Sequence, residues 1–161
     1  MISQKMTDAI NDQIKAEFES AYLYLAMSAY LEAKNLKGMA HWLKEQFKEE
    51  QEHAEKLMKH LYERGARVTL EAISKPSAEF GTPLDVFKAV AKHERLVSDR
   101  INKMMDLAVE EKDYASQSML TWFINEQVDE EADADDIVNK MEFLKDSNSS
   151  IYLLDKELGQ R

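Results

Sequence analysis

The sequence contains no cysteine, and only four glycines and two prolines occur among its 161 residues. The missing thiols exclude disulfides, thiolate zinc sites, iron–sulfur clusters and cysteine nucleophiles. Basic residues are also in the minority, with 21 Lys and Arg against 31 Asp and Glu and a net charge of -10. Such a surplus of negative charge disfavours nucleic acid and anionic membranes as partners, and it favours cations as ligands.

Long apolar runs are absent as well. Residues 20–31 form the longest uncharged stretch in the first half of the chain, which is shorter than the roughly 20 apolar residues that a membrane-spanning helix needs. The first residues also lack the basic-then-apolar pattern of a signal peptide. We therefore expect a cytoplasmic protein, with residues 1–161 forming a single domain of sufficient size to bury a sizeable core.

The few glycines and prolines divide a chain rich in helix-forming residues into long segments. Ser3 is a suitable N-cap for a first helix that runs to about Lys34, and a second helix is expected to follow Gly38 and to end near Gly65. Residues 66–82 form a long connection. The sequence Thr82-Pro83-Leu84-Asp85 then supplies a cap, a proline at the first helical position and an acid in the first turn, which together indicate a new helix.

The third helix is expected to reach about Lys112, and Asp113 is a suitable cap for a fourth helix that reaches about Lys145. Residues 146–150 break the chain, and an amphipathic tail over 151–158 predicts a short fifth helix with bounds of about 148–158. No strand pattern competes with these helices. The predicted fold is all-α: a four-helix bundle over about 3–145, made of two antiparallel hairpins with a long crossover between the second and third helices.

Each of the four long segments carries an apolar stripe at alternating steps of three and four residues, and polar residues interrupt every stripe at one level. Such matched interruptions converge in the interior of a bundle. The stripes are Ile10, Ile14, Glu17, Ala21, Tyr24, Ser28 and Leu31; Leu43, Phe47, Glu50, Ala54, Leu57 and Leu61, with His53 beside them; Phe87, Val90, Glu94, Val97, Ile101, Met104 and Ala108; and Leu120, Phe123, Gln127, Glu130, Ala134, Ile137, Met141 and Leu144.

The spacing of the interruptions repeats between the two halves of the chain. Glu17 and Glu50 are 33 residues apart, as are Glu94 and Gln127, and a step of three leads from Glu50 to His53 and from Gln127 to Glu130. An isolated buried carboxylate costs several kcal/mol, so four of them need protons, salt bridges or metal. The stripes offer no Lys or Arg beside these acids, which leaves a dinuclear metal site or a polar network without metal. Four carboxylates with one imidazole and one amide suit a pair of cations such as iron, and they do not exclude manganese or zinc.

On these residues the chain resembles the bacterial non-haem ferritins over essentially its whole length. The resemblance is carried by Glu17 in AEFESAYLYLAMSAY, Glu50 and His53 in KEEQEHAEKL, Glu94 in AKHERL, and Gln127 and Glu130 in WFINEQVDEE. It implies a ferritin-like bundle whose ferroxidase centre oxidises Fe(II) with dioxygen or peroxide. It also implies that the ferric mineral is stored in a hollow homo-oligomeric shell of 24 subunits.

The resemblance further implies a role for each matching residue. Glu17, Glu50 and His53 would hold a first iron, and Glu50 would bridge to a second iron held by Glu94 and Glu130, with Gln127 lining that side. Tyr24 matches a family tyrosine that can supply an electron. A third iron position is implied at Glu49, Glu126, Asp129 and Glu130, although the family usually has a longer glutamate in place of Asp129.

Related families fit less well. Haem-binding bacterioferritins use a methionine where this chain has Gln51, so no haem is expected, and they share with rubrerythrins a second Glu-x-x-His where this chain has Gln127-x-x-Glu130. Rubrerythrins also need cysteines, and the DNA-protecting mini-ferritins lack the short fifth helix. Two other functions remain as alternatives: a rubrerythrin-like di-iron oxidase or peroxide reductase that stores no iron, and a non-catalytic helical bundle that binds passing cations.

Other polar residues have ordinary structural interpretations. Surface or hydrogen-bonded roles are expected for the three remaining histidines and packing for Trp122, which could also act as a redox bystander. The acidic run over 126–136 is interpreted mainly as a solvated face, with a cation-guiding route as the alternative. The residues in question are His41, His60 and His93, together with Glu131, Asp135 and Asp136 of the run.

Overall fold

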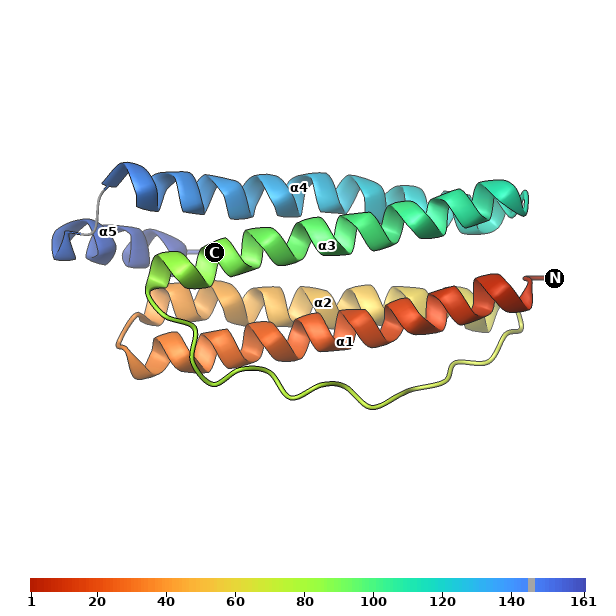
Figure 1. The fold of residues 1–161 in the computed structure, drawn as a ribbon, viewed down its shortest axis with the longest axis horizontal. Coiled ribbons are helices and arrows are strands. Elements are labelled where there is room, and N and C mark those ends of the chain that lie inside the picture. Colours follow the sequence, from red (N-terminus) through yellow and green to blue (C-terminus); the bar gives the residue numbers. More distant parts are fainter. Residues whose placement is uncertain (145–146) are drawn as a thin grey trace.

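The structure is a computed structural model and describes residues 1–144 and 147–161. The described residues form five α-helices and no strand, which confirms the all-α prediction. The two hairpins lie against each other, with the fifth helix packed at one end (Figure 1). The helices are α1 (Gln4–Ala33), α2 (Lys37–Glu63), α3 (Pro83–Glu110), α4 (Tyr114–Leu144) and α5 (Asn148–Leu158).

Three of the predicted helix starts are confirmed by capping hydrogen bonds. The Ser3 hydroxyl accepts from the Met6 amide at the start of α1. Thr82 and Asp85 form a reciprocal capping box at the start of α3, and each cap satisfies amides that would otherwise lack partners. The Asp113 carboxylate accepts from the Ser116 amide at 3.2 Å at the start of α4. The predicted end of the fourth helix at Lys145, and the first residue of the predicted break, Asp146, lie outside the described residues.

The predicted role of Gly38 as a helix breaker is wrong. The turn before α2 is made by Asn35, whose φ is +61°, and α2 begins at Lys37, so Gly38 lies in its first turn. A Cβ atom on Gly38 would lie 1.6 Å from the Asp155 carbonyl oxygen of α5. The glycine is therefore required for the close approach of two helices, which the sequence around it does not reveal.

The crossover over 64–82 runs in extended form along the whole length of α1 (Figure 1). The Asn11 side chain holds its first part through the Arg67 carbonyl and the Thr69 amide, at 3.0 and 2.8 Å. Tyr30 donates to the Gly81 carbonyl at its far end, at 2.7 Å. The crossover thereby returns the chain to the end of the bundle at which α2 began, so α3 runs in the same direction as α2.

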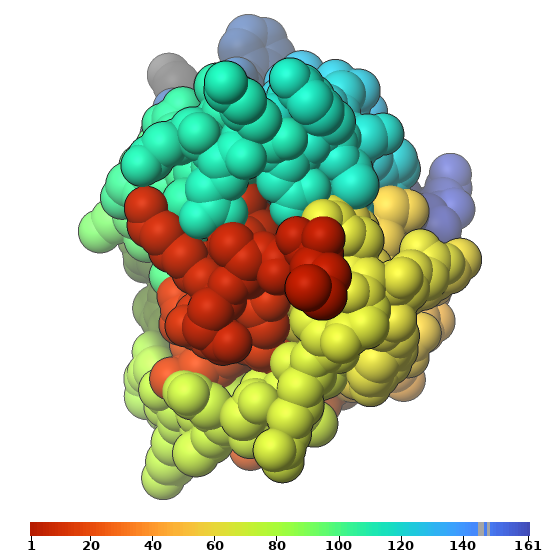
Figure 2. All heavy atoms as spheres, turned by 90° about the vertical axis from the view of Figure 1, so that its right-hand side faces the viewer, coloured from red at the N-terminus to blue at the C-terminus, as the bar shows by residue number. Residues whose placement is uncertain are grey.

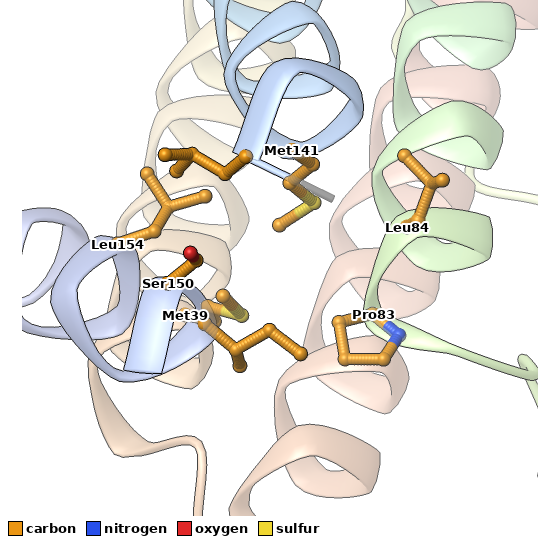
Figure 3. A pocket seen from close by; sticks show the side chains of 8 residues that line it. Met39, Pro83, Leu84, Met141, Ser150 and Leu154 are labelled. Atoms are coloured by element: carbon orange, nitrogen blue, oxygen red, sulfur yellow. The ribbon is translucent and has the colours of Figure 1, made fainter. Parts of the chain in front are cut away.

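The two ends of the bundle differ in chemistry. Figure 2 looks onto the end where the N-terminus, the end of α2 and the α3–α4 turn meet, and polar contacts join them there. Ser3 donates to Glu111 at 2.6 Å, and Arg64 pairs with Asp113 at 2.9 Å. At the other end, α5 covers an apolar pocket into which the sulfur-bearing side chains of Met39 and Met141 project (Figure 3).

Buried polar side chains, among them Glu17, Glu50, Glu94 and Glu130, form a layer across the core. This polar layer divides the core into two apolar clusters. One cluster, near the α1–α2 turn, includes Leu31, Trp42 and Phe87, and the other, toward the N-terminus, includes Ile10 and Phe123. The predicted stripes are buried with three exceptions: Phe47 and Met141 are half-buried, and Leu144 is exposed. Gln46 is fully buried at the level of Phe47.

No helix within residues 1–144 and 147–161 combines the length and the apolar character that crossing a bilayer requires.

Candidate metal centre

The polar layer is formed by the predicted ligands, which all four long helices direct into the interior. α1 supplies one carboxylate, α2 a carboxylate and an imidazole, α3 a carboxylate, and α4 an amide and a carboxylate. None of these side chains is more than 6% exposed, and Tyr24 beside them is fully buried. The members of the layer are Glu17, Glu50, His53, Glu94, Gln127 and Glu130.

Three of these residues form a ready metal-binding group. One ligand atom from each of Glu17, Glu50 and His53 lies within 4.8 Å of the others. The second carboxylate oxygens, Glu17 Oε2 and Glu50 Oε2, are buried without a hydrogen-bond partner among the described residues. Buried carboxylate oxygens are rarely left unpaired because each loses the hydrogen bonds of water. Free oxygen lone pairs beside an imidazole suit a cation of intermediate hardness such as iron.

The α3–α4 side of the layer holds its side chains in a hydrogen-bonded arrangement. Tyr24 donates to Glu94 Oε1, and the Gln127 amide lies 3.2 Å from both Glu94 Oε2 and the Glu94 carbonyl oxygen. Glu94 is therefore fixed from two directions. Gln127 donates through Nε2, so its carbonyl oxygen is the atom that could face a cation.

Burial and mutual repulsion raise the pKa values of these carboxyl groups, which disfavours their ionisation in the metal-free protein. Burial raises the pKa of Glu50 well above its usual value, and the charge of Glu17 raises it further. Burial also raises the pKa of Glu94, and burial with the charge of Glu94 raises the pKa of Glu130 to about 8. The pKa of Tyr24 is raised well above 10 by burial and by Glu94, so this phenol remains a hydrogen-bond donor. Like-charged carboxylates brought this close have strong affinity for protons, and a divalent cation can replace those protons.

Two glutamines behind the layer were not predicted from the sequence. Gln13 Nε2 donates to Glu17 Oε1 at 2.8 Å, and Gln46 Nε2 donates to Glu130 Oε2 at 2.7 Å. Both glutamines are buried, and each lies four residues before a predicted ligand of its own helix. The i,i+4 step from Gln13 to Glu17 was a visible signal. The bond from Gln46 crosses to α4, which no local spacing indicates.

Each glutamine is held in turn by an arginine. Arg100 Nε donates to Gln13 Oε1 at 2.9 Å, and Arg161 Nη1 donates to Gln46 Oε1. Because the arginine fixes which way each amide points, the glutamine must present its NH₂ group to the carboxylate. Hydrogen bonds of this kind orient metal-binding side chains in protein sites.

The residues of the predicted third position are only partly brought together. Glu126 joins His53 and Glu130 in a second group whose ligand atoms lie within 4.8 Å of one another. Glu49 instead pairs with Arg161 at 2.7 Å. Asp129 is exposed to solvent and belongs to neither group of potential ligands found among the described residues.

The remaining histidines have hydrogen-bond partners outside the layer. His60 lies 3.1 Å from the Ser116 hydroxyl and His93 lies 2.8 Å from the Ser20 hydroxyl, and burial lowers the pKa of both imidazoles. His41 is half-buried and contacts the Arg161 carbonyl at 3.0 Å. Neither group of potential metal ligands includes these three histidines.

Trp122 packs edge-on against His53, with ring centroids 5.5 Å apart. The ammonium of Lys56 lies over the indole at 3.8 Å. The tryptophan thus shields the imidazole from solvent, in agreement with the packing role expected for it.

The acidic run on α4 is partly neutralised by neighbouring side chains. Asp135 forms an ion pair with Arg95 at 2.7 Å, and Asp136 pairs with Lys140 at 2.8 Å. Glu131 accepts a hydrogen bond from Ser98. Asp136 is exposed, whereas Glu131 and Asp135 are half-buried, so the interpretation as a solvated face fits Asp136 fully and the other two only in part.

Comparisons with known proteins are consistent over the full chain. A family model described as a ferritin-like domain matches residues 7–144. A bacterial non-heme ferritin of Bacteroides fragilis is 43% identical over 161 residues, which are 100% of both chains. One from Staphylococcus aureus is 36% identical over 161 residues, covering 100% of this chain and 97% of the other. An open pore ferritin from the archaeon Archaeoglobus fulgidus superposes with a TM-score of 0.99 at 43% identity, covering 100% of this chain and 99% of that one.

Proposed function

The chain belongs to the ferritin family, and from this membership we propose that it is an iron-storage ferritin whose polar layer is the ferroxidase centre. The substrate is Fe(II), the product is Fe(III), and the electron acceptor is dioxygen or peroxide. The observation that carries the assignment is the buried set of four carboxylates and one imidazole, in which Glu17 Oε2 and Glu50 Oε2 have no partner among the described residues.

The proposed roles follow the two sides of the layer. Glu17, Glu50 and His53 hold one iron, and their mutual proximity supports this assignment. Glu94 and Glu130 hold a second iron, which Glu50 bridges to the first, and Gln127 lines that side. Two irons are therefore expected in each subunit, and no haem.

The protein supplies charge and geometry to this reaction. Anionic oxygen ligands stabilise Fe(III) relative to Fe(II), because the harder ion gains more from them. The two Fe(II) ions would give up two electrons, which with two protons reduce dioxygen to hydrogen peroxide, or hydrogen peroxide to two waters. Tyr24, which donates to Glu94, is the proposed source of a further electron when dioxygen is reduced beyond peroxide.

Storage of a mineral requires a hollow assembly, and we propose a homo-oligomeric shell of 24 subunits. Oligomerisation is supported by the solved relatives, which include an open pore ferritin from Archaeoglobus fulgidus and an engineered closed form of that ferritin. A third iron position near Glu126 and Glu130, and a cytoplasmic location, remain predictions.

Aerobic addition of Fe(II) tests the proposal directly. The wild-type protein is expected to accelerate formation of the amber ferric absorbance and to retain iron after gel filtration. Glu50→Ala and His53→Ala should reduce the initial rate by about 100-fold or more, since each removes a ligand of the reacting metal. Glu52→Ala, an exposed acid on the same helix, serves as the matched control and should oxidise iron at the wild-type rate.

The outcome also separates the alternatives. A passive cation-binding bundle would give no acceleration over buffer. A rubrerythrin-like oxidase would accelerate oxidation but would leave the iron outside the eluted protein. Wild-type rates in both Glu50→Ala and His53→Ala would overturn the assignment of the centre.

A further inference from the structure

We propose that Arg161 controls the third cation position, because its guanidinium occupies the Glu49 side of that position until a cation displaces it. The inference rests on the proposed function. It concerns a residue that follows α5 and that neither belongs to the polar layer nor was expected to act on it.

The guanidinium of Arg161 contacts one predicted ligand of the third position and the glutamine that holds another. Its Nη2 lies 2.7 Å from Glu49 Oε2. Its Nη1 donates to Gln46 Oε1. Gln46 Nε2 in turn donates to Glu130 Oε2 at 2.7 Å. A single cationic group thus binds one predicted ligand directly and orients another through a buried amide.

The surroundings of Arg161 hold the guanidinium in this place. The Trp42 ring lies beneath it, with 4.8 Å between the guanidinium carbon and the ring centroid. The His41 ring contacts the Arg161 carbonyl oxygen at 3.0 Å. The side chains of Arg161 and Glu49 are only 27% and 39% exposed, so their charges are screened less than those of a fully solvated pair.

A divalent cation and a guanidinium compete for the same carboxylate. An ion that takes Glu49 as a ligand must bind a carboxylate that Arg161 already neutralises, and it must do so beside that second positive charge. The two-ion centre meets less of this competition, because Arg161 makes its hydrogen bonds to Glu49 and Gln46 and is linked to Glu130 through the neutral amide of Gln46. Arg161 is therefore a specificity-determining residue that favours two tightly bound cations over three.

Titration of metal-free protein with Zn(II), followed by calorimetry, tests this without any redox reaction. Wild type is expected to bind two Zn(II) ions per subunit tightly and a third weakly. Arg161→Gln should tighten the third step by roughly tenfold or more, because one positive charge close to the ion is removed. Arg161→Lys keeps the charge, so the affinity of its third step should remain near that of wild type. If the arginine acted only through its hydrogen-bond geometry, the lysine and glutamine variants would bind the third ion with the same affinity.

Two further variants complete the design. Glu49→Gln in the Arg161→Gln background should return the third step to its weak wild-type affinity, because the freed carboxylate is gone. Arg67→Gln changes the net charge equally at an exposed residue of the crossover and should leave all steps unchanged.

The results separate this proposal from the proposed function. An unchanged third step in Arg161→Gln, or a gain that persists without Glu49, would overturn the role of Arg161. Loss of the first two ions in Arg161→Gln would also contradict it, since Arg161 would then support the centre itself. Failure of the wild-type protein to bind a pair of ions would instead contradict the proposed function.

Discussion

The carboxylates of the polar layer are the residues on which the chemistry of this molecule depends. Three of them, Glu50, Glu94 and Glu130, have raised pKa values because they are buried among one another. A carboxyl group with a raised pKa in the folded state binds more protons there than in the unfolded chain. The free energy of unfolding therefore falls as the pH rises from the unfolded value toward the folded one.

The pH dependence of the metal-free protein gives the first prediction. For Glu130 the window runs from an ordinary 4.5 to about 8, so the melting temperature should fall by roughly 5–10 °C between pH 5 and pH 8. Glu130→Gln, which cannot ionise, should flatten this fall. Zn(II) should abolish it, because the bound metal replaces the protons. Thermal unfolding followed by circular dichroism measures the effect, and a melting temperature that rises over this window would refute the explanation.

Gln13 provides a second prediction at the residue scale. Its amide is the partner of Glu17 Oε1 and is itself held by Arg100. Gln13→Ala should weaken binding of the Zn(II) pair by about 10–100-fold, as is typical when a group that orients a metal ligand is removed. The affinity for the Zn(II) pair is measured by calorimetry for this variant and for the control Gln4→Ala, which changes an exposed glutamine of the same helix. Equal affinities in the two variants would show that Glu17 needs no such support.

At the scale of the helices, α5 is seated on α2 by a close backbone approach. The Asp155 side chain accepts from the Met39 amide at 2.9 Å, and Gly38 leaves no room for a Cβ beneath the Asp155 carbonyl. Because Arg161 follows this helix, the position of α5 also sets where the guanidinium lies.

Gly38→Ala should therefore displace α5 without disrupting the four long helices. Overpacking of this kind costs about 1–3 kcal/mol, so hydrogen exchange of the α5 amides should become roughly tenfold faster or more. Gly65→Ala is the control: its Cβ meets nothing within 4 Å, although its φ of +70° makes the variant slightly strained. If the α5 amides exchange at the same rate in both variants, the close approach at Gly38 does not hold the helix in place.

The elements differ in how far the sequence could predict them. Helices with strong caps, such as Ser3 and the Thr82–Asp85 pair, were placed correctly because capping is a local interaction. The burial of Leu144 was wrongly predicted, because a stripe says nothing about whether a partner helix extends alongside its last turn. The convergence of the polar layer followed from matched spacing. The contacts from Gln46 and Arg161 join residues far apart in the chain, and no periodicity reports them.

For the whole molecule, the surface indicates assembly. Large apolar side chains remain exposed in the single chain, among them Tyr114 at 72%, Phe143 at 85% and Tyr152 at 67%. Tyr114 begins α4, whereas Phe143 and Tyr152 lie at the far end of α4 and on α5, so the exposed groups stand at both ends of the bundle. A ferritin shell would supply the neighbours that cover them.

The size of the particle is the fourth prediction. A shell of 24 subunits of 18.6 kDa has a mass of about 446 kDa, and native mass spectrometry or gel filtration with light scattering should report it. The shell should retain ferric iron when loaded. A particle of one or two subunits that oxidises iron would instead support the non-storing alternative.

The extended crossover described above also bears on the order in which the molecule folds. Close approaches of the backbone are concentrated within the α1–α2 and α3–α4 hairpins, so each hairpin is able to form from contacts that are near in sequence, which is the fast class of folding event. Docking of the two halves is the step that brings the carboxyl pair of α1 and α2 against the pair of α3 and α4. Protons or iron therefore act on the docking step. A cation held by the completed layer therefore stabilises the docked arrangement of the two hairpins.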